Sequence, residues 1–147
     1  REAEAATAAY QQTWPLEQYQ ILTVNARVDH LYSVQTHAFQ YLWENRLAQS
    51  PQDFKALGNR PVSGGGLRLL MPPHSVGGQD PVTIEIRIES FLQEPRKLLV
   101  ETAFTWPKPR AVGKDGRFES RVYLEMVERY AAGEVWNFIV PGDKADS

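Results

Sequence analysis

Hydrophobic and polar residues alternate most regularly in the middle of the chain. Every second residue from 82 to 88 is Val or Ile, and the residues between them are polar. A period of two is typical of a β-strand with one buried face. The alternation returns over residues 98–106, after a turn signal at residues 93–96. The two segments therefore predict a long antiparallel β-hairpin.

Two further segments have the character of strands. Residues 22–28 alternate between apolar and polar side chains. Residues 67–71 are mostly apolar and lie between the glycine run 64–66 and the Pro72-Pro73 pair. Glycine and proline punctuate secondary structure, so this second segment predicts a short strand with sharp limits.

Between the first strand and the glycine run, the apolar period changes to three or four residues. Residues 33–49 contain no Gly or Pro and predict an amphipathic helix, capped by Ser33 and ended by Ser50-Pro51. A second, short helix is expected from Pro51 to Leu57, with Gly58 as its end. The first helix is expected to bury Val34, Ala38, Tyr41 and Leu42 against Ile84, Ile86, Ile88, Val100 and Phe104.

Residues 118–132 fit two patterns. Apolar residues at a spacing of three to four predict a helix that ends at Gly133, whereas the alternation over 118–126 predicts a strand. In the second interpretation, residues 131–133 form a turn and residues 135–140 a last strand. The Val, Tyr and Trp content favours strands, which would give a continuous meander. The helix remains the alternative.

These elements predict an α+β domain with one or two N-terminal helices packed on a mainly antiparallel sheet of about four to six strands, ending in a C-terminal meander. Residues 1–13 are expected to be a flexible polar linker or terminal extension, 14–142 a single domain, and 143–147 a tail. The expected strand pair at the end, with Trp136 on its second strand, resembles the last hairpin of domains of the nuclear-transport-factor-two type. That resemblance implies no activity, because the fold hosts enzymes, binders and scaffolds.

Composition narrows the function classes. The chain has 147 residues, a formal net charge of −2 and no cysteine. Disulfides, thiolate nucleophiles and Cys-based zinc sites are therefore excluded. A dedicated nucleic-acid binder usually carries a strong basic excess, so we expect no nucleic-acid partner. No apolar run approaches the roughly 20 residues that a membrane-spanning helix needs.

The first nine residues are rich in Ala and Glu and contain no large apolar side chain. Glu-Ala-Glu-Ala after Arg1 resembles the remnant of a yeast secretion leader, and the alternative is a natural spacer after a removed signal or a membrane anchor. Both interpretations predict a location outside the cytosol, periplasmic or secreted. An ordinary terminal helical turn is the third interpretation.

Candidate catalytic and metal-binding residues are few. His30, His37 and Glu44 are seven residues apart, and seven residues rise about 10.5 Å along a helix, too far for ligands of one ion. His74 next to Ser75 is not a triad without an orienting carboxylate. The glycine run at 64–66 lacks the Lys-Ser/Thr that follows in a phosphate-binding loop. We therefore predict no catalytic residue, metal site or cofactor.

The segment after the hairpin is the best-defined candidate binding site. Residues 106–117 carry four positive charges and one negative charge next to a Trp. They could bind an anionic surface, an acidic partner or a sugar acid, although three net charges give only weak docking to a membrane. The alternative is a solvated loop in which the Trp covers the core edge. The candidate residues are Trp106, Lys108, Arg110, Lys114 and Arg117.

The aromatic residues offer a second candidate. A helix on a curved sheet can enclose an aromatic pocket for a small ligand. The alternative is that the same rings fill the core. The rings that could line such a pocket are Phe39, Trp43, Phe104, Trp106, Tyr123 and Trp136.

The sequence thus predicts a non-catalytic interaction or assembly domain, the soluble part of an exported or membrane-tethered bacterial envelope protein. Its partner would be another protein or a second copy, with weak contact to an anionic surface as a further option. The alternative is a small-molecule-binding domain or an enzyme that uses the aromatic pocket. An assembly domain should show an open sheet edge or an exposed apolar patch.

Overall fold

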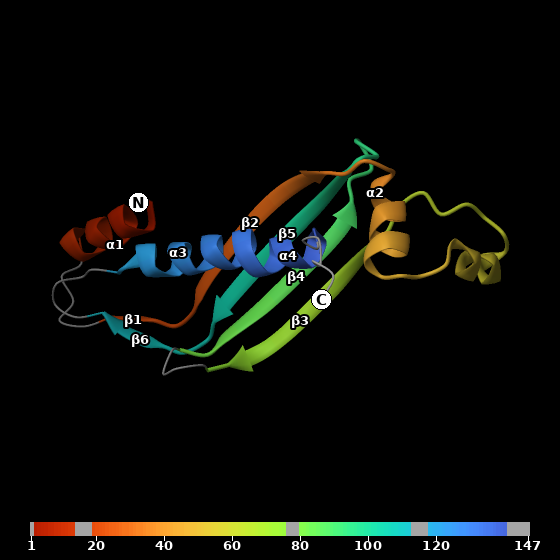
Figure 1. Ribbon diagram of the computed structural model, residues 1–147. Helices are drawn as coiled ribbons and strands as arrows, with labels where there is room; N and C mark the ends of the chain where they lie inside the picture. Colours follow the sequence, from red (N-terminus) through yellow and green to blue (C-terminus); the bar gives the residue numbers. More distant parts are fainter. Residues whose placement is uncertain (1, 14–18, 76–79, 113–117, 141–147) are drawn as a thin grey trace, which may run out of the picture.

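The computed structural model describes residues 2–13, 19–75, 80–112 and 118–140. Its largest element is a four-stranded antiparallel sheet with the order β2-β5-β4-β3 (Figure 1). The prediction of an α+β fold with an antiparallel sheet is therefore confirmed. The strands are β2 (Val24–Ser33), β3 (Gly66–His74), β4 (Val82–Ser90) and β5 (Lys97–Trp106).

The predicted central hairpin is present as β4 and β5. Ile84 lies opposite Phe104 and Ile88 opposite Val100, so the apolar sets of the two strands share one face. The outer strands are longer than the alternation suggested. In particular, β3 continues through Pro72-Pro73, with a register shift against β4 between Met71 and His74.

A second sheet of two short strands lies beyond one end of the main sheet (Figure 1). It pairs β1 (Tyr19–Ile21) with β6 (Arg110–Val112) in antiparallel orientation. These strands directly precede β2 and follow β5, so the small sheet extends the β2-β5 pair after a break in each strand. The break on the second strand is the Pro107–Pro109 segment, where proline removes backbone donors.

The C-terminal segment is helical, so the favoured prediction of strands over 118–126 and 135–140, joined by a turn at 131–133, is wrong. It comprises α3 (Ser120–Tyr130), the π-helical turn η3 (Ala131–Val135) and α4 (Trp136–Ile139), which together lie across one face of the sheet (Figure 1). The expected C-terminal meander is therefore absent among the described residues, and the expected resemblance to a terminal hairpin does not hold. Gly133 lies inside the helical run and does not end it.

The physical reason is an apolar repeat of four residues that continues past Gly133. Val127, Ala131, Val135 and Ile139 are each 1% exposed and face the sheet. By contrast, Val122 and Leu124, which contributed to the apparent strand pattern, are about half exposed. The side chains that bury apolar area are thus those with the helical period.

The predicted helix at 33–49 is shorter at both ends. Ser33 is the last residue of β2, and the helical run consists of α2 (Ala38–Gln40) and the π-helical η1 (Tyr41–Arg46). Its cap is His37 rather than Ser33, because the His37 Nδ1 accepts a hydrogen bond from the Phe39 amide at 3.3 Å. Ala38 and Leu42 enter the core as expected, and Val34 and Tyr41 pack beside it.

The short second helix is confirmed as the 3-10 helix η2 (Pro51–Leu57). It begins at Pro51 and ends at Gly58, which has a φ of 80° that favours glycine. Near the N-terminus, residues Glu2–Thr13 form the helix α1. The expected linker over residues 1–13 is therefore helical from residue 2, and the expected tail at 143–147 lies outside the described residues.

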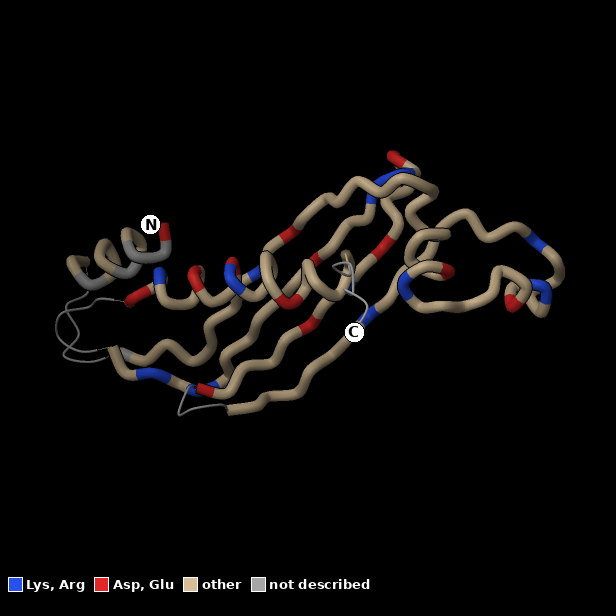
Figure 2. Tube along the Cα trace, in the orientation of Figure 1, with Lys and Arg blue, Asp and Glu red and all other residues tan. Residues whose placement is uncertain are grey.

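The two faces of the main sheet differ in character. The face under the C-terminal helix is apolar and forms the core with α2 and η1. The opposite face carries a chain of ion pairs that crosses all four strands, and Figure 2 shows its basic and acidic positions mixed along the strands. In order, the chain of pairs runs Arg68, Glu85, Arg87, Glu101, Arg27 and Asp29.

Among the helices that the structure describes, none is both long enough and apolar enough to cross a bilayer.

Candidate functional site

Trp106, the aromatic residue of the predicted anion site, is a core residue. It is 2% exposed, stacks on Phe104 at 5.7 Å between ring centres and meets Tyr123 edge-on at 4.9 Å. Its ring therefore has no free face on which a ligand could stack. This position matches the alternative in which the indole covers the end of the core.

Two of the predicted cations are bound to one acid of the chain itself. Lys108 Nζ donates to Asp80 Oδ1 at 3.0 Å, and Arg110 Nη2 donates to Asp80 Oδ2 at 2.7 Å. These two hydrogen bonds lower the pKa of the Asp80 carboxyl. The Arg110 guanidinium also lies 5.1 Å from the ring centre of Tyr123. Lys114 and Arg117 lie outside the described residues, so anion binding by this segment stays a prediction.

A small pocket of about 480 Å³ lies beside this cluster. Trp106, Tyr123 and Met126 supply its apolar part, and Asp80 and Glu125 its acids. Both acids are paired, Asp80 with the two cations above and Glu125 with Arg121. The pocket thus presents two carboxylates that are each paired with cations of the chain itself, and the lowered pKa of Asp80 favours its charged form.

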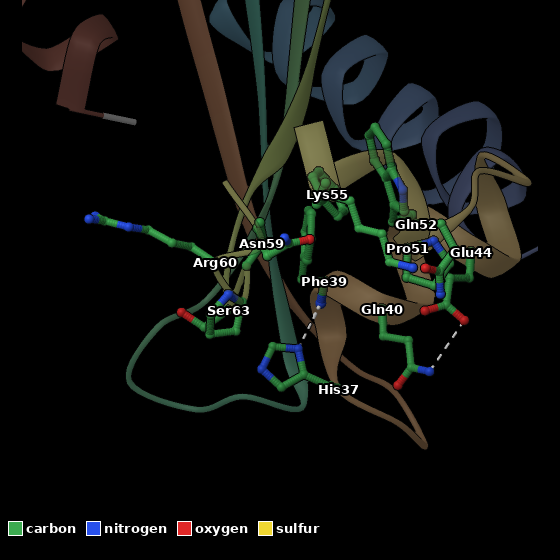
Figure 3. A pocket seen from close by; sticks show the side chains of 14 residues that line it. His37, Phe39, Gln40, Glu44, Pro51, Gln52, Lys55, Asn59, Arg60 and Ser63 are labelled. Atoms are coloured by element: carbon green, nitrogen blue, oxygen red, sulfur yellow. Dashed lines mark hydrogen bonds between the residues drawn. The ribbon is translucent and has the colours of Figure 1, made fainter. Parts of the chain in front are cut away.

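A larger open pocket, of about 640 Å³, lies between α2, η1 and residues 51–63 (Figure 3). Three rings form its aromatic wall. Phe39 is stacked on Trp43 at 6.0 Å, and Phe54 of η2 lies 5.6 Å from Phe39 and 4.8 Å from Trp43. The Trp43 Nε1 donates to the Ser50 carbonyl at 3.1 Å and fixes the indole. We call Phe39, Trp43 and Phe54 the aromatic groove.

Gly65 allows Phe39 to take this position. A Cβ on Gly65 would lie 2.6 Å from Phe39 Cε2, closer than side-chain contacts allow. The Gly65 amide donates to the buried Ser90 Oγ at 3.0 Å, which holds the backbone against the sheet. The sequence marked the glycine run only as the start of a strand, and the structure gives Gly65 a packing role.

The rim of the aromatic groove is polar. His37 and Glu44 both lie there, yet each is used locally. The His37 Nδ1 caps α2, and Glu44 Oε2 accepts from Gln40 Nε2 at 3.3 Å, as the dashed lines of Figure 3 show. Arg60 extends away from the groove (Figure 3). Such a rim can orient a bound segment, and the rings supply contact area.

The six rings predicted to line one pocket divide among separate places. Phe39 and Trp43 are in the aromatic groove, and Trp106 and Tyr123 border the small pocket. Phe104 is buried in the core, and Trp136 packs on Tyr32 at 4.9 Å. Phe54 was missed by the sequence reasoning. Its signal was its place as the one aromatic residue of the short helix between Pro51 and Gly58.

Metal binding finds no geometric support in the described parts of the chain, where no three His, Asp or Glu side chains gather closely enough to hold an ion. The three residues at seven-residue spacing separate among three places: His30 lies in β2, His37 precedes α2, and Glu44 is in η1.

The outer edge of β2 is the third surface feature. In the described structure, β2 pairs only with β5, so its other edge carries unpaired backbone groups. The strand has ten residues and contains no Gly or Pro. β3 forms the opposite edge, where Pro72-Pro73 and the register shift interrupt the ladder. Prolines and irregularities protect sheet edges from pairing, and β2 has neither.

The flanks of the β2 edge differ along the strand. On the helix side, its second half carries a row of rings, in which His30 stacks on Tyr32 at 5.8 Å and Tyr32 contacts Trp136. Beside its first half is a hollow of about 400 Å³ lined by Val24, Ala26 and other residues. The remaining lining residues are Glu2, Asn25, Phe118, Ser120, Tyr123 and Leu124.

A scan against protein-family models finds no match, and searches of curated proteins and of solved structures find no significant match either. The function is therefore argued from the geometry of these three surfaces.

Proposed function

We propose that this chain is a non-catalytic assembly domain that binds a protein partner through the outer edge of β2. The observation that carries the proposal is the contrast between the two sheet edges. β2 offers an uninterrupted edge of ten residues, of which every second one has unpaired backbone groups, whereas β3 is interrupted by Pro72-Pro73. An added strand gains main-chain hydrogen bonds from such an edge and specificity from alternate side chains.

The side chains along β2 support this choice. Leu31 is 49% exposed on the open face, and Trp136 is 41% exposed beside the helix-side ring row. Arg27 and Asp29 place one charge of each sign on the same edge. Apolar and aromatic groups beside mixed charges are typical of protein interfaces. The location outside the cytosol, in a bacterial envelope complex, belongs to the proposal and rests on the sequence alone.

Photocrosslinking in cells that produce the chain tests this function. A benzoylphenylalanine at Leu31 should give defined adducts, and the same group at Leu70 of β3, which is 61% exposed, is the matched control. The proposal expects adducts from β2 that disappear when Asp29→Pro, in a chain that still folds, removes one of the β2 amides that point away from β5. No adduct from Leu31, or equal adducts from both edges, would contradict it.

The aromatic groove favours a second candidate function, the binding of an extended proline-containing segment. Aromatic-lined grooves accept such segments at low entropic cost because the bound conformation is preformed. Trp43 and Phe54 are half-buried and border the pocket of about 640 Å³. A proline-rich peptide panel should change the Trp43 fluorescence of the Trp14→Phe, Trp106→Phe, Trp136→Phe chain. A panel without effect at millimolar concentration would exclude this candidate.

Contact with an anionic surface through Lys108, Arg110, Lys114 and Arg117 is a weaker proposal. Vesicles that contain phosphatidylserine are the probe, and the comparison is a variant with alanine at all four positions. Because Lys108 and Arg110 are bound to Asp80, the net positive charge available near the membrane is small. Equal binding by both proteins would end the proposal.

A further inference from the structure

The charge pattern of β2 identifies a partner for its open edge. We propose that two copies of this chain pair their β2 strands antiparallel about a twofold axis at Val28. This inference rests on the proposed function and names its partner. The two sheets would then form one continuous sheet, because an axis perpendicular to the sheet keeps both helix-covered faces on the same side.

On the open face, this register joins opposite charges. In an antiparallel pair centred on Val28, Arg27 of one copy lies opposite Asp29 of the other, and the reverse pair follows by symmetry. Both side chains are accessible, with Arg27 59% and Asp29 44% exposed, and within one chain they form an ion pair at 2.8 Å. Pairing of two copies would exchange this internal contact for two equivalent contacts between the copies. Arg27 also contacts Glu101 at 2.9 Å, so the ion pairs that cross one sheet would continue into the next.

Other registers lose this complementarity. Side chains alternate between the two faces of a strand. The helix-covered faces of both copies therefore lie on the same side only when the twofold axis passes beside a residue, and not when it passes between two residues. Centring on Arg27 places two arginines opposite each other, and centring on Asp29 does the same with two aspartates. Like charges directly opposite destabilise a pair of strands. The Val28 register also aligns residues 24–32 of both copies, nearly the full length of the strand.

On the helix-covered face, the same register places complementary side chains of the two copies opposite each other. Tyr32 of one copy lies opposite Val24 of the other, and His30 lies opposite Ala26. The ring row at the second half of one β2 therefore faces the hollow of about 400 Å³ beside the first half of the other. Each interface contains this contact twice. Rings with one polar atom placed against an apolar hollow are typical anchors of an interface.

A pair of charge variants tests the register. Arg27→Asp leaves two acids at positions 27 and 29, and Asp29→Arg leaves two bases. Each variant alone should dimerise about 30-fold more weakly than the unchanged chain, because both symmetric contacts become repulsive. Mixed one to one, the two variants should form a heterodimer, since every contact is again between opposite charges. Sedimentation velocity measures all three samples.

Single cysteines give a second, independent readout, since the chain has no cysteine of its own. Val28→Cys should form an intermolecular disulfide under mild oxidation, because residues on the axis have Cα atoms about 5 Å apart. Ser33→Cys is the control on the same strand. In the proposed register its two copies are about 34 Å apart, given a rise of about 3.4 Å per residue, and should not be joined.

The outcomes separate this inference from the proposed function. Heterodimer rescue together with a disulfide at Val28 alone would establish the register. A monomeric chain whose Leu31 crosslinks to a different protein would overturn self-pairing and leave the assembly function in place. A monomeric chain without adducts would overturn both. Failure to fold is recognised by circular dichroism, and mixing would not rescue association of an unfolded variant.

Discussion

Thr102 lies at the centre of the helix-covered face, between Ile86 of β4 and Val28 of β2. Its side chain is fully buried, and its Oγ1 has no hydrogen-bond partner in the described structure. A buried unpaired hydroxyl destabilises the folded state, so Thr102→Val should raise the free energy of unfolding by about 1 kcal/mol. Urea unfolding measures the change. A loss of stability would show that the hydroxyl is paired.

Thr105→Val is the matched control for this prediction. Thr105 is on the same strand but on the open face, where it is partly exposed. Its replacement should change the free energy of unfolding by less than about 0.5 kcal/mol, as is usual for surface positions.

Two glycines should respond to alanine in opposite directions. Gly65→Ala places a Cβ against the Phe39 ring and should destabilise the fold by about 1–3 kcal/mol. Gly133→Ala meets no atom within 4 Å and lies in the C-terminal helical run, so it should stabilise by about 0.5–1 kcal/mol. Thermal unfolding of both variants checks the contrast. Equal effects would contradict the packing role of Gly65.

Single residues also show what the sequence could and could not reveal. Pro51 and Gly58 were assigned correctly because backbone restrictions act locally. The His37 cap was missed although it is a local contact with the Phe39 amide, two residues further on. The burial of Trp106 was only an alternative interpretation, because it depends on segments distant in the sequence. For Trp106, the deciding neighbour is Tyr123, which the strand interpretation placed in a different element.

At the scale of elements, the C-terminal helix is held at its end by side chains of η1. Tyr41 OH donates to the Ile139 carbonyl at 2.7 Å, and Arg46 Nη2 donates to the Phe138 carbonyl. Carbonyls in the last turn of a helix lack intrahelical partners and carry partial negative charge. The caps therefore join two elements that are about 100 residues apart in sequence.

Tyr41→Phe removes one cap and keeps the ring. The variant should lose about 1 kcal/mol of unfolding free energy, the usual contribution of one hydrogen bond. Tyr32→Phe is the control, because the Tyr32 hydroxyl has no hydrogen-bond partner among the residues described, and it should be nearly neutral. Chemical denaturation of both variants measures the difference. Equal stability of Tyr41→Phe and the unchanged chain would contradict the capping role.

The segment that contains Lys108 and Arg110 should give the fold a specific acid sensitivity. Hydrogen bonds from these cations lower the pKa of the Asp80 carboxyl below its ordinary value. A carboxyl with a lowered folded pKa stabilises the fold above its unfolded pKa, and this contribution is lost as the pH falls through the folded pKa. Asp80→Asn should therefore show a smaller decrease in Tm between pH 7 and pH 3.

Removing the partners should have the same effect on pH dependence. In the Lys108→Gln, Arg110→Gln variant, Asp80 loses the two cationic donors that lower its pKa, so the decrease in Tm on acidification should again be smaller. A decrease equal to that of the unchanged chain in both variants would show that this cluster does not couple folding to pH.

The elements that were predicted well are those whose period is unambiguous. The strands β4 and β5 alternate over their whole length, and both faces of the hairpin follow from that pattern. The C-terminal segment was ambiguous because Val122 and Leu124 are apolar but exposed. A repeat of four residues from Val127 to Ile139 was present in the sequence, and Gly133 in its middle obscured it.

At the scale of the molecule, the sheet has one face under the C-terminal helix and one face open. The fold class could be predicted from the strand patterns and the helical pattern around α2. The sequence did not show that the C-terminal helix covers the sheet. The three candidate surfaces differ in how far apart in the sequence their defining residues lie. The cation segment and the rings were visible in the sequence, but the open β2 edge exists only once the strand order is known.

Hydrogen exchange at two protein concentrations tests the assembly account most directly. As concentration rises through the range of dimer formation, amides of β2 should exchange more slowly, because an added strand pairs the edge. Amides of β3, including Leu67 to Met71, should not change and serve as the internal control. Protection of β3 without β2, or identical exchange at all concentrations up to the millimolar range, would contradict self-pairing through β2.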